Sequence, residues 1–206
     1  MRPSTHPFVA THGQIILTIV EDFSAATQVA SDDRNQFSGH NPRRLLLRQP
    51  VPEDGPAITR LIAASPPLDR NSAYCNLLQC TDFADTCVVA ELGGEVAGWI
   101  SAYRPPSAPD RLFVWQVAVA QQARGTGLAG TMLDSLIERP AASDAAMLVT
   151  TITSDNAQSW ALFEAFARRH HAQIERVPRF EREAHFGGAH DTEWEARIAP
   201  LPQPSK

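Results

Sequence analysis

The stretch QQARGTGLAG (residues 121–130) has the residue types and spacing that can hold a phosphate group. Gly125, Gly127 and Gly130 match G-x-G-x-x-G, the pattern of a dinucleotide-binding loop. Gln122 with the first two of these glycines also matches Q-x-x-G-x-G, the pattern of a different phosphate loop. In either loop, glycines let backbone N–H groups approach the phosphate, and the start of a helix supplies unpaired donors and a favourable dipole.

The position of the loop favours the second pattern. In a dinucleotide-binding domain the first glycine follows the first strand almost immediately, and an acidic residue stands about 20 positions further on. Here the preceding strand is about the fourth of the chain and ends near Val119, several residues before Gly125, while Asp134 and Glu138 fall inside the next helix. Arg124 adds a positive charge to the loop. We therefore predict a cradle for a pyrophosphate; a turn that the glycines merely shape is the alternative.

The composition predicts a packed domain, and we expect no nucleic acid as a partner. Of 206 residues, 43% are hydrophobic and 20% charged, which favours a folded core over disorder. The net charge is -5, and no basic run is long enough to follow a phosphate backbone. The one lysine is Lys206, so neither a Schiff-base lysine nor a P-loop lysine is expected inside the domain.

Metal, disulfide and membrane functions are not expected either. The three cysteines form no C-x-x-C pair, which predicts neither a disulfide framework nor a zinc site. His185 and His190 lie five positions apart in a glycine-containing stretch, and we expect no metal there. The apolar residues 14–20 are too few to span a bilayer. A cytoplasmic protein fits these features.

The rest of the chain must supply the elements that position this loop. We expect a poorly ordered extension over residues 1–43, one domain over residues 44–199, and a proline-rich tail over residues 200–206. Predicted strands cover residues 44–49, a hairpin over 86–103 that turns at Gly93 and Gly94, 111–119, 147–153, about 172–177 and about 194–198. Predicted helices cover 52–65, a segment from Asn71 or Ser72 to 80 with Leu77 and Leu78 inward, 127–138, and 156–171 with Asp155 or Asn156 as cap.

This order of elements predicts the fold class. The central hairpin is incompatible with a purely parallel, doubly wound sheet. We expect an α/β (α+β) domain in which helices flank a mixed, mostly antiparallel sheet.

Two segments resemble one family. VWQVAVAQQARGTGLAGTML resembles the coenzyme A loop of the GCN5-related N-acetyltransferases (GNAT), and LVTTITSDNAQSWALFEAF resembles the second cofactor-side segment of that family. The resemblance implies a single GNAT-type domain, acetyl-CoA as co-substrate, no metal, and a bulge in the strand before the loop. It implies that backbone N–H groups around Val117 stabilise the oxyanion, and that Gly130 is a helix residue allowing close packing. The implied acetyl-CoA-binding residues are Val117, Ala118, Val119, Gln122, Ala123, Arg124, Gly125, Thr126, Gly127, Leu128, Ala129, Asn156 and Ser159.

A narrower resemblance covers residues 44–199. The blocks PPLDRNSAYCNLLQCTDFADTCVVAE, GWISAYRPP, LFVWQVAV and FGGAHDTEWEARI resemble the L-2,4-diaminobutyrate acetyltransferases of ectoine biosynthesis. The resemblance implies acetyl transfer to the N4 (side-chain) amine of L-2,4-diaminobutyrate, in the bacterial cytoplasm, by a homodimer that serves compatible-solute synthesis under osmotic stress.

The resemblance also implies a substrate site. The implied substrate-binding residues are Asp69, Asn71, Ser72, Tyr74, Trp115, His190 and Glu193, with Arg104 as a weaker candidate for the substrate carboxylate. Tyr74 and Glu193 are the implied catalytic residues: Glu193, or water held by Glu193 and Tyr74, would remove the amine proton. Taken alone, Asp69 could stabilise a helix start, Tyr74 and Trp115 could be core aromatics, and Glu193 and His190 could be surface residues.

One departure from the wider family keeps other functions open. Phe163 stands where many members have a tyrosine that protonates the departing thiolate. A non-catalytic acyl-CoA-binding sensor is therefore one alternative. An acetyltransferase for another small amine or for a protein N-terminus is the other.

Overall fold

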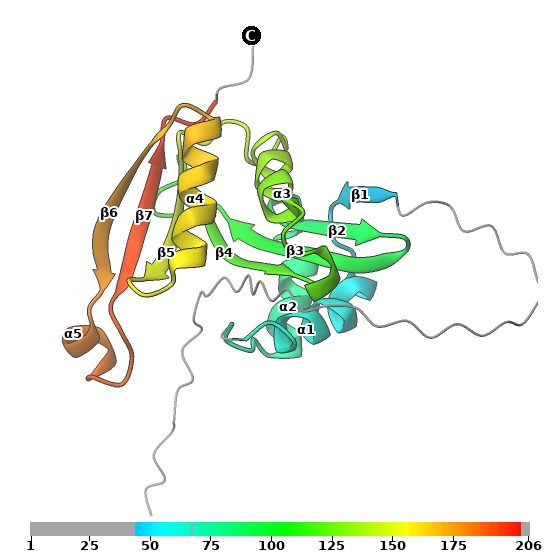
Figure 1. Cartoon of the computed structure of the whole chain (residues 1–206), viewed down its shortest axis with the longest axis horizontal. Coiled ribbons are helices and arrows are strands. Elements are labelled where there is room, and N and C mark those ends of the chain that lie inside the picture. Colours follow the sequence, from blue (N-terminus) through cyan, green and yellow to red (C-terminus); the bar gives the residue numbers. More distant parts are fainter. Residues whose placement is uncertain (1–43, 67, 203–206) are drawn as a thin grey trace, which may run out of the picture.

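A computed structural model describes residues 44–66 and 68–202 as one seven-stranded sheet with helices on both faces (Figure 1). The expected extension over residues 1–43 and most of the expected tail lie outside the described residues. In the order β1-β2-β3-β4-β5-β7-β6, the strands are Leu45–Arg48, Val88–Leu92, Glu95–Tyr103, Arg111–Val119, Met147–Thr153, Glu193–Ala199 and Gln173–Phe180.

The sheet is mixed and mostly antiparallel, as the sequence predicts. Its one parallel pair joins β4 to β5, and their register covers only residues 111–113 with residues 147–149. Beyond Phe113 the two strands separate, and α4 lies over the opening in Figure 1. A gap therefore opens in the middle of the sheet, between the half made of β1–β4 and the half made of β5, β7 and β6.

Helices cover the two faces and create two cores. On one face, α3 (Leu128–Ile137) and α4 (Ala157–Arg169) pack their apolar residues against the sheet and form the larger core. On the other face, α1 (Gly55–Ala63) and α2 (Ala73–Cys80) cover the β2–β4 half, where Trp99 lies fully buried in the smaller core. Short elements complete the chain: 3-10 turns at Pro52–Asp54, Ala84–Thr86 and Gln121–Ala123, and α5 at Arg182–Phe186. None of the described helices is long and apolar enough to cross a membrane.

Helix α2 differs from its prediction in the face that it buries. Leu77 is 38% exposed and Leu78 only half-buried, whereas Asn76, Gln79 and Cys80 are buried. The reason is a polar contact, because the Asn76 side-chain nitrogen donates to the Thr59 hydroxyl of α1 (2.9 Å). The short helix α5 was not predicted either.

Strand β4 contains the expected bulge. Its pairing with β3 shifts between Ser101 and Ala102, so that Trp115 has no partner residue across the ladder. Leu112 and Val114 face the larger core before the bulge, and residues 117 and 119 face the same core after it. The extra residue therefore switches which residues of β4 point to each face of the sheet.

Candidate active site

The glycine-containing loop forms one wall of an open hollow at the start of α3. The hollow has about 510 Å³ of empty volume. Its lining residues are Val119, Ala123, Arg124, Gly125, Gly127, Leu128, Ala129, Gly130 and Leu162. Gly125 (φ 71°) and Gly127 (φ 80°) adopt the left-handed conformation that favours glycine, and a Cβ on Gly127 would meet no atom within 4 Å. Within the part of the chain that the structure describes, no side chain caps α3, so its first N–H groups can serve an anion in the hollow.

Side chains of the loop fix its shape from within. Arg124 Nε donates to the Val119 carbonyl oxygen (3.0 Å), and Thr126 Oγ1 donates to the Ala123 carbonyl oxygen (2.7 Å). Gln122 is exposed at the edge of the loop. The cradle thus keeps its curvature through short internal hydrogen bonds.

Gly130 has a packing role, as its position in the helix predicts. It is buried in α3, and a Cβ there would lie 3.1 Å from Arg169 Nη2. The same nitrogen donates to the Gly130 carbonyl oxygen (3.3 Å), while Arg169 also bonds to Asp134. The glycine therefore lets α4 approach α3, although Gly130 also borders the hollow.

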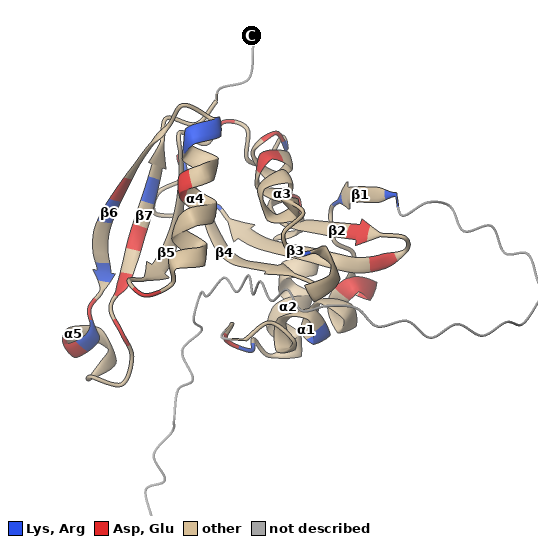
Figure 2. Cartoon of the chain, in the orientation of Figure 1, with Lys and Arg blue, Asp and Glu red and all other residues tan. Residues whose placement is uncertain are grey.

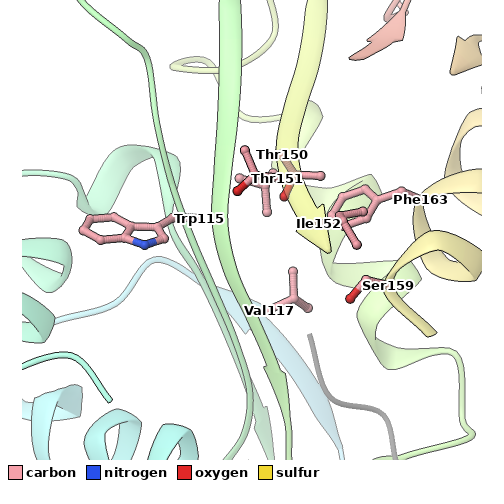
Figure 3. A pocket seen from close by; sticks show the side chains of 8 residues that line it. Trp115, Val117, Thr150, Thr151, Ile152, Ser159 and Phe163 are labelled. Atoms are coloured by element: carbon pink, nitrogen blue, oxygen red, sulfur yellow. The ribbon is translucent and has the colours of Figure 1, made fainter. Parts of the chain in front are cut away.

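A second space, the β4–β5 cleft, opens where the two strands part (Figure 3). It has about 200 Å³ of empty volume. Its lining residues are Val114, Trp115, Val117, Thr150, Thr151, Ile152, Ser159 and Phe163. Figure 3 shows the Val117, Ile152 and Phe163 side chains on the cleft side of β4, whereas the Trp115 indole points to the opposite side. Phe163 is 2% exposed, so the far wall of the cleft is hydrocarbon.

The start of α4 stands beside this cleft. Asn156 caps the helix, since its Oδ1 accepts from the Ser159 backbone N–H (3.1 Å), and Ser159 in turn borders the cleft. Ala118 belongs to the smaller core on the other face of the sheet, so its side chain does not face the cleft. Of the residues implied to bind acetyl-CoA, Val117 of β4 and Ser159 of α4 line the cleft, whereas Val119, Ala123, Arg124, Gly125, Gly127, Leu128 and Ala129 line the hollow.

Glu193 is a buried carboxylate at the first position of β7. It pairs with Thr153 of β5 and is 4% exposed, and neither of its oxygens has a hydrogen-bond partner among the described residues. Burial raises the pKa of Glu193 to about 7. His190, with Nε2 4.0 Å from Glu193 Oε1, and the Thr151 hydroxyl lower this pKa, while the negative charges of Asp69 and Asp155 raise it.

The fold brings Asp69 and Glu193 into one electrostatic environment, although 124 positions separate them. Asp69 lies in the loop before α2, and Glu193 belongs to the other half of the sheet. Because two like charges near each other are unfavourable, a cation between these carboxylates would be stabilised. A protonated amine is such a cation.

A group of aromatic rings lies along β3 and β4. The Tyr103 ring lies 6.4 Å from Trp115, 5.2 Å from Phe113 and 6.2 Å from Phe83, all centroid to centroid. Trp115 is half-buried, so one part of its indole is accessible to a ligand.

Other residues implied for the substrate site have structural partners. Asn71 Nδ2 donates to Gln116 Oε1 (2.7 Å), and Ser72 Oγ caps α2 by accepting from the Cys75 N–H (3.1 Å). Tyr74 is 70% exposed, so its side chain stands largely in solvent. Arg104, the weaker candidate for the substrate carboxylate, binds Asp144 (2.6 Å) and the carbonyls of Pro109 and Ala141, so its guanidinium has protein partners.

Glu195 lies on the same face of β7 as Glu193, but its carboxylate has arginine partners. Both acidic and basic residues lie along β6 and β7 (Figure 2). Glu195 is also buried, but it accepts from Arg179 (2.8 Å) and Arg197 (2.6 Å), and Arg111 lies 3.6 Å away. Glu193 has no arginine partner among the ion pairs of the described residues. Of these two carboxylates, Glu193 is therefore the one that can bind a ligand.

Gln116 is a residue that the sequence predictions missed. It is 0% exposed in β4, and its amide nitrogen donates to the Asp69 carbonyl oxygen (3.1 Å). The sequence did contain a feature that could have marked Gln116: it is the one polar residue in the strand-forming run LFVWQVAV, residues 112–119.

Comparison with known proteins agrees with this geometry. The pattern of the acetyltransferase (GNAT) family matches residues 56–167. The L-2,4-diaminobutyric acid acetyltransferase of Methylotuvimicrobium alcaliphilum is 47% identical over 76% of this chain and 91% of that protein. The enzyme of the same name from Halomonas elongata is 44% identical over 79% of this chain and 85% of that protein.

Solved structures show the same relationship. The diaminobutyrate acetyltransferase EctA from Paenibacillus lautus, in complex with L-2,4-diaminobutyric acid and coenzyme A, is 34% identical with a TM-score of 0.74, over 80% of this chain and 99% of that one. A putative acetyltransferase from Salmonella typhimurium with acetyl-CoA is 16% identical with a TM-score of 0.60, over 79% of this chain and 97% of that one, and shows the fold alone. The chain belongs to the acetyltransferase (GNAT) family, within its group of L-2,4-diaminobutyric acid acetyltransferases.

Proposed function

We propose that this acetyltransferase moves the acetyl group of acetyl-CoA to the N4 amine of L-2,4-diaminobutyrate. The observation that carries the proposal is Glu193, a buried carboxylate whose oxygens accept no hydrogen bond from residues 44–66 or 68–202. Its pKa is near 7, and the negative charge of Asp69 helps to raise it. A diamine offers two positive groups to two carboxylates, and the relatives with 41–47% identity carry the name of this substrate.

The residues that line the hollow and the cleft fit acetyl-CoA. The left-handed glycines, the uncapped start of α3 and Arg124 suit the pyrophosphate of the co-substrate. The apolar wall made by Ile152 and Phe163 suits the thioester end, and it would exclude water from the acetyl group. Both spaces border β4, so one extended molecule can occupy them together.

Glu193 is the proposed general base. An alkylammonium has an ordinary pKa of about 10 and must lose a proton before it attacks. A carboxylate with a pKa of about 7 is ionised in a large fraction of molecules at neutral pH and is a better base than an unperturbed one. One ammonium proton passes to a Glu193 oxygen, and the nitrogen lone pair forms the new N–C bond. The C–S bond then breaks with its electron pair going to the thiolate, and the remaining extra proton leaves the product nitrogen to water.

The oxyanion of this reaction needs a fixed donor. The Gln116 backbone N–H donates toward β3, to Ser101 Oγ (3.2 Å), and successive N–H groups of a strand point to opposite sides. The Val117 N–H is therefore directed toward the β4–β5 cleft, which supports it as the oxyanion donor.

The departing thiolate needs no dedicated acid in this proposal. Phe163 occupies the cleft wall where the wider family often has a tyrosine, and a thiol with a pKa of about 8.5 is a fair leaving group without protonation. Tyr74 stays a candidate for holding substrate or water at the entrance, since its hydroxyl is accessible.

We further propose the biological setting that the resemblance implies. The product would enter ectoine biosynthesis, in the cytoplasm of a bacterium that makes this compatible solute under osmotic stress, and the working enzyme would be a homodimer. The catalytic domain would span residues 44–199, with residues 1–43 as an extension and 200–206 as a tail.

The test is acetyl-CoA turnover with L-2,4-diaminobutyrate, followed by thiol release and by identification of the product isomer. We expect the N4-acetyl product, and much slower reaction with diamino acids one carbon shorter or longer. Preferential acetylation at N2, or equal rates with unrelated amines or peptides, would contradict the proposal. Coenzyme A binding without thiol release would favour a sensor.

A further inference from the structure

The Gln116 side chain connects the bulged strand β4 to the loop that carries Asp69. The amide is fully buried; Nε2 donates to the Asp69 carbonyl oxygen (3.1 Å), and Oε1 accepts from Asn71 Nδ2 (2.7 Å). A backbone carbonyl can only accept, so the amide has one orientation in which both contacts are satisfied. Gln116 therefore holds the loop at two points, one on either side of Arg70.

The loop is held from its other side by a chain of hydrogen bonds. Asn71 Nδ2 also donates to Asn76 Oδ1 (3.3 Å), Asn76 Nδ2 donates to Thr59 Oγ1 (2.9 Å), and Thr59 donates to the Gly55 carbonyl oxygen (2.8 Å). This series of hydrogen bonds ends at the Asp69 carbonyl on one side and at the Gly55 carbonyl on the other. Each amide hydrogen in the series has its own acceptor. The loop, α1, α2 and β4 thus share one polar network, in which the Asn71 amide donates in two directions: toward Gln116 and toward Asn76.

On the strand side, Gln116 stands directly at the bulge. It follows Trp115, the residue without a partner across the ladder, and its own N–H donates to Ser101 Oγ (3.2 Å). Val117, the proposed oxyanion donor, is the next residue. One short side chain therefore spans the distance from the strand that would hold the acetyl group to the loop that would hold an amine.

The geometry points to Gln116 as a positioning residue that sets the distance between the Asp69 loop and the reacting strand, and so selects which amine reaches the acetyl group. This inference rests on the proposed function. Gln116 itself is buried and acts only through Asp69 and Asn71. Reacting atoms must approach within about 3–3.5 Å, and a displacement of about 1 Å can cost about 100-fold in rate. Because the two amines of diaminobutyrate sit at different distances along one short chain, the same displacement would also change the product isomer.

The experiment compares Gln116→Met with Thr86→Val in the full-length enzyme. Methionine keeps the length of the side chain but loses both hydrogen bonds. Thr86, in the η2 turn at Ala84–Thr86, is a matched control. Its buried hydroxyl also donates a hydrogen bond, to the Ala102 carbonyl oxygen (2.7 Å). Both variants should lower the melting temperature. For Gln116→Met alone we expect kcat/KM for diaminobutyrate to fall by about 100-fold, the KM for acetyl-CoA to stay within error, and N2-acetyl product to appear.

The outcomes separate the two ideas. A Gln116→Met variant with the kinetic constants and isomer ratio of Thr86→Val would overturn the inference alone. A wild-type enzyme that does not acetylate diaminobutyrate would overturn the proposed function and this inference together. If Gln116→Met does not fold, Gln116→Asn tests the same point, because it keeps the amide but cannot reach both Asp69 and Asn71. Unchanged isomer ratio and KM in that variant would also overturn the inference.

Discussion

Replacing Glu193 by glutamine should change both the stability and the rate, each with a defined dependence on pH. The native pKa of Glu193 is raised from the ordinary 4.5 to about 7 by burial. This difference corresponds to about 3 kcal/mol at most, at about 1.4 kcal/mol for each pH unit. Since the folded state binds the proton more tightly, the stability from this group is complete below about pH 4.5 and is lost as pH rises through about 7.

The Glu193→Gln variant has no such loss. The free energy of unfolding of the variant minus that of the wild type should therefore increase by up to about 3 kcal/mol between about pH 4.5 and about pH 8. Denaturant unfolding at several pH values measures this difference, and contributions from unchanged groups largely cancel in it. A difference that stays flat across the range would refute the idea that Glu193 is a desolvated carboxylate.

The kinetic half of the prediction uses thiol release from acetyl-CoA. In the wild type, kcat/KM for diaminobutyrate should rise with an apparent pKa near 7, and in Glu193→Gln this rise should disappear together with about 100-fold or more of the rate. Glu195→Gln is the matched control, since Glu195 lies on the same face of β7 but is held by arginines. It should keep the wild-type pH profile. A Glu193→Gln enzyme with normal turnover at every pH would assign the base elsewhere.

Three further predictions concern the hollow, the amine site and the cleft. Gly127→Glu should weaken coenzyme A binding at least about tenfold in titration calorimetry, whereas Gly94→Glu, which carries the same left-handed strain in an exposed turn, should leave affinity unchanged. Asp69→Asn should raise the KM for diaminobutyrate and move the pH–rate profile to lower pH, because Asp69 raises the pKa of Glu193; a profile that stays in place would separate the two residues. Phe163→Tyr should change kcat by less than about threefold, since a coenzyme A thiolate leaves unaided; a large increase in single-turnover rate would show that protonation of the thiolate limits the reaction.

The regular elements were predictable because each has a local signal. The Gly93–Gly94 turn between two strand-forming runs predicted the β2–β3 hairpin, and both glycines have positive φ. Asp155 or Asn156 was predicted as the cap of the last long helix, and Asn156 caps α4. These features depend on a few neighbouring residues, so the sequence contains the information needed to place them.

The site was harder to predict from the sequence, because it depends on contacts between segments that are far apart in the chain. Asp69 and Glu193 could be named as candidates only through a family resemblance, since nothing near Glu193 in the sequence indicates that β7 pairs with β5 and buries it. The α2 face was predicted wrongly because Asn76 has its partner, Thr59, on another helix. Gln116 was overlooked for the same reason, as its partners lie 45 and 47 positions away.

Trp115 gives strand β4 one residue more than the core requires. If that residue were deleted, Leu112, Val114, Val117 and Val119 would fall on one face in regular alternation, and the larger core would keep its contacts. The protein would lose the kink beside the cleft and an indole that borders the substrate region, but no core side chain. A one-residue deletion inside a central strand, normally among the least tolerated of changes, should here yield a folded and inactive enzyme.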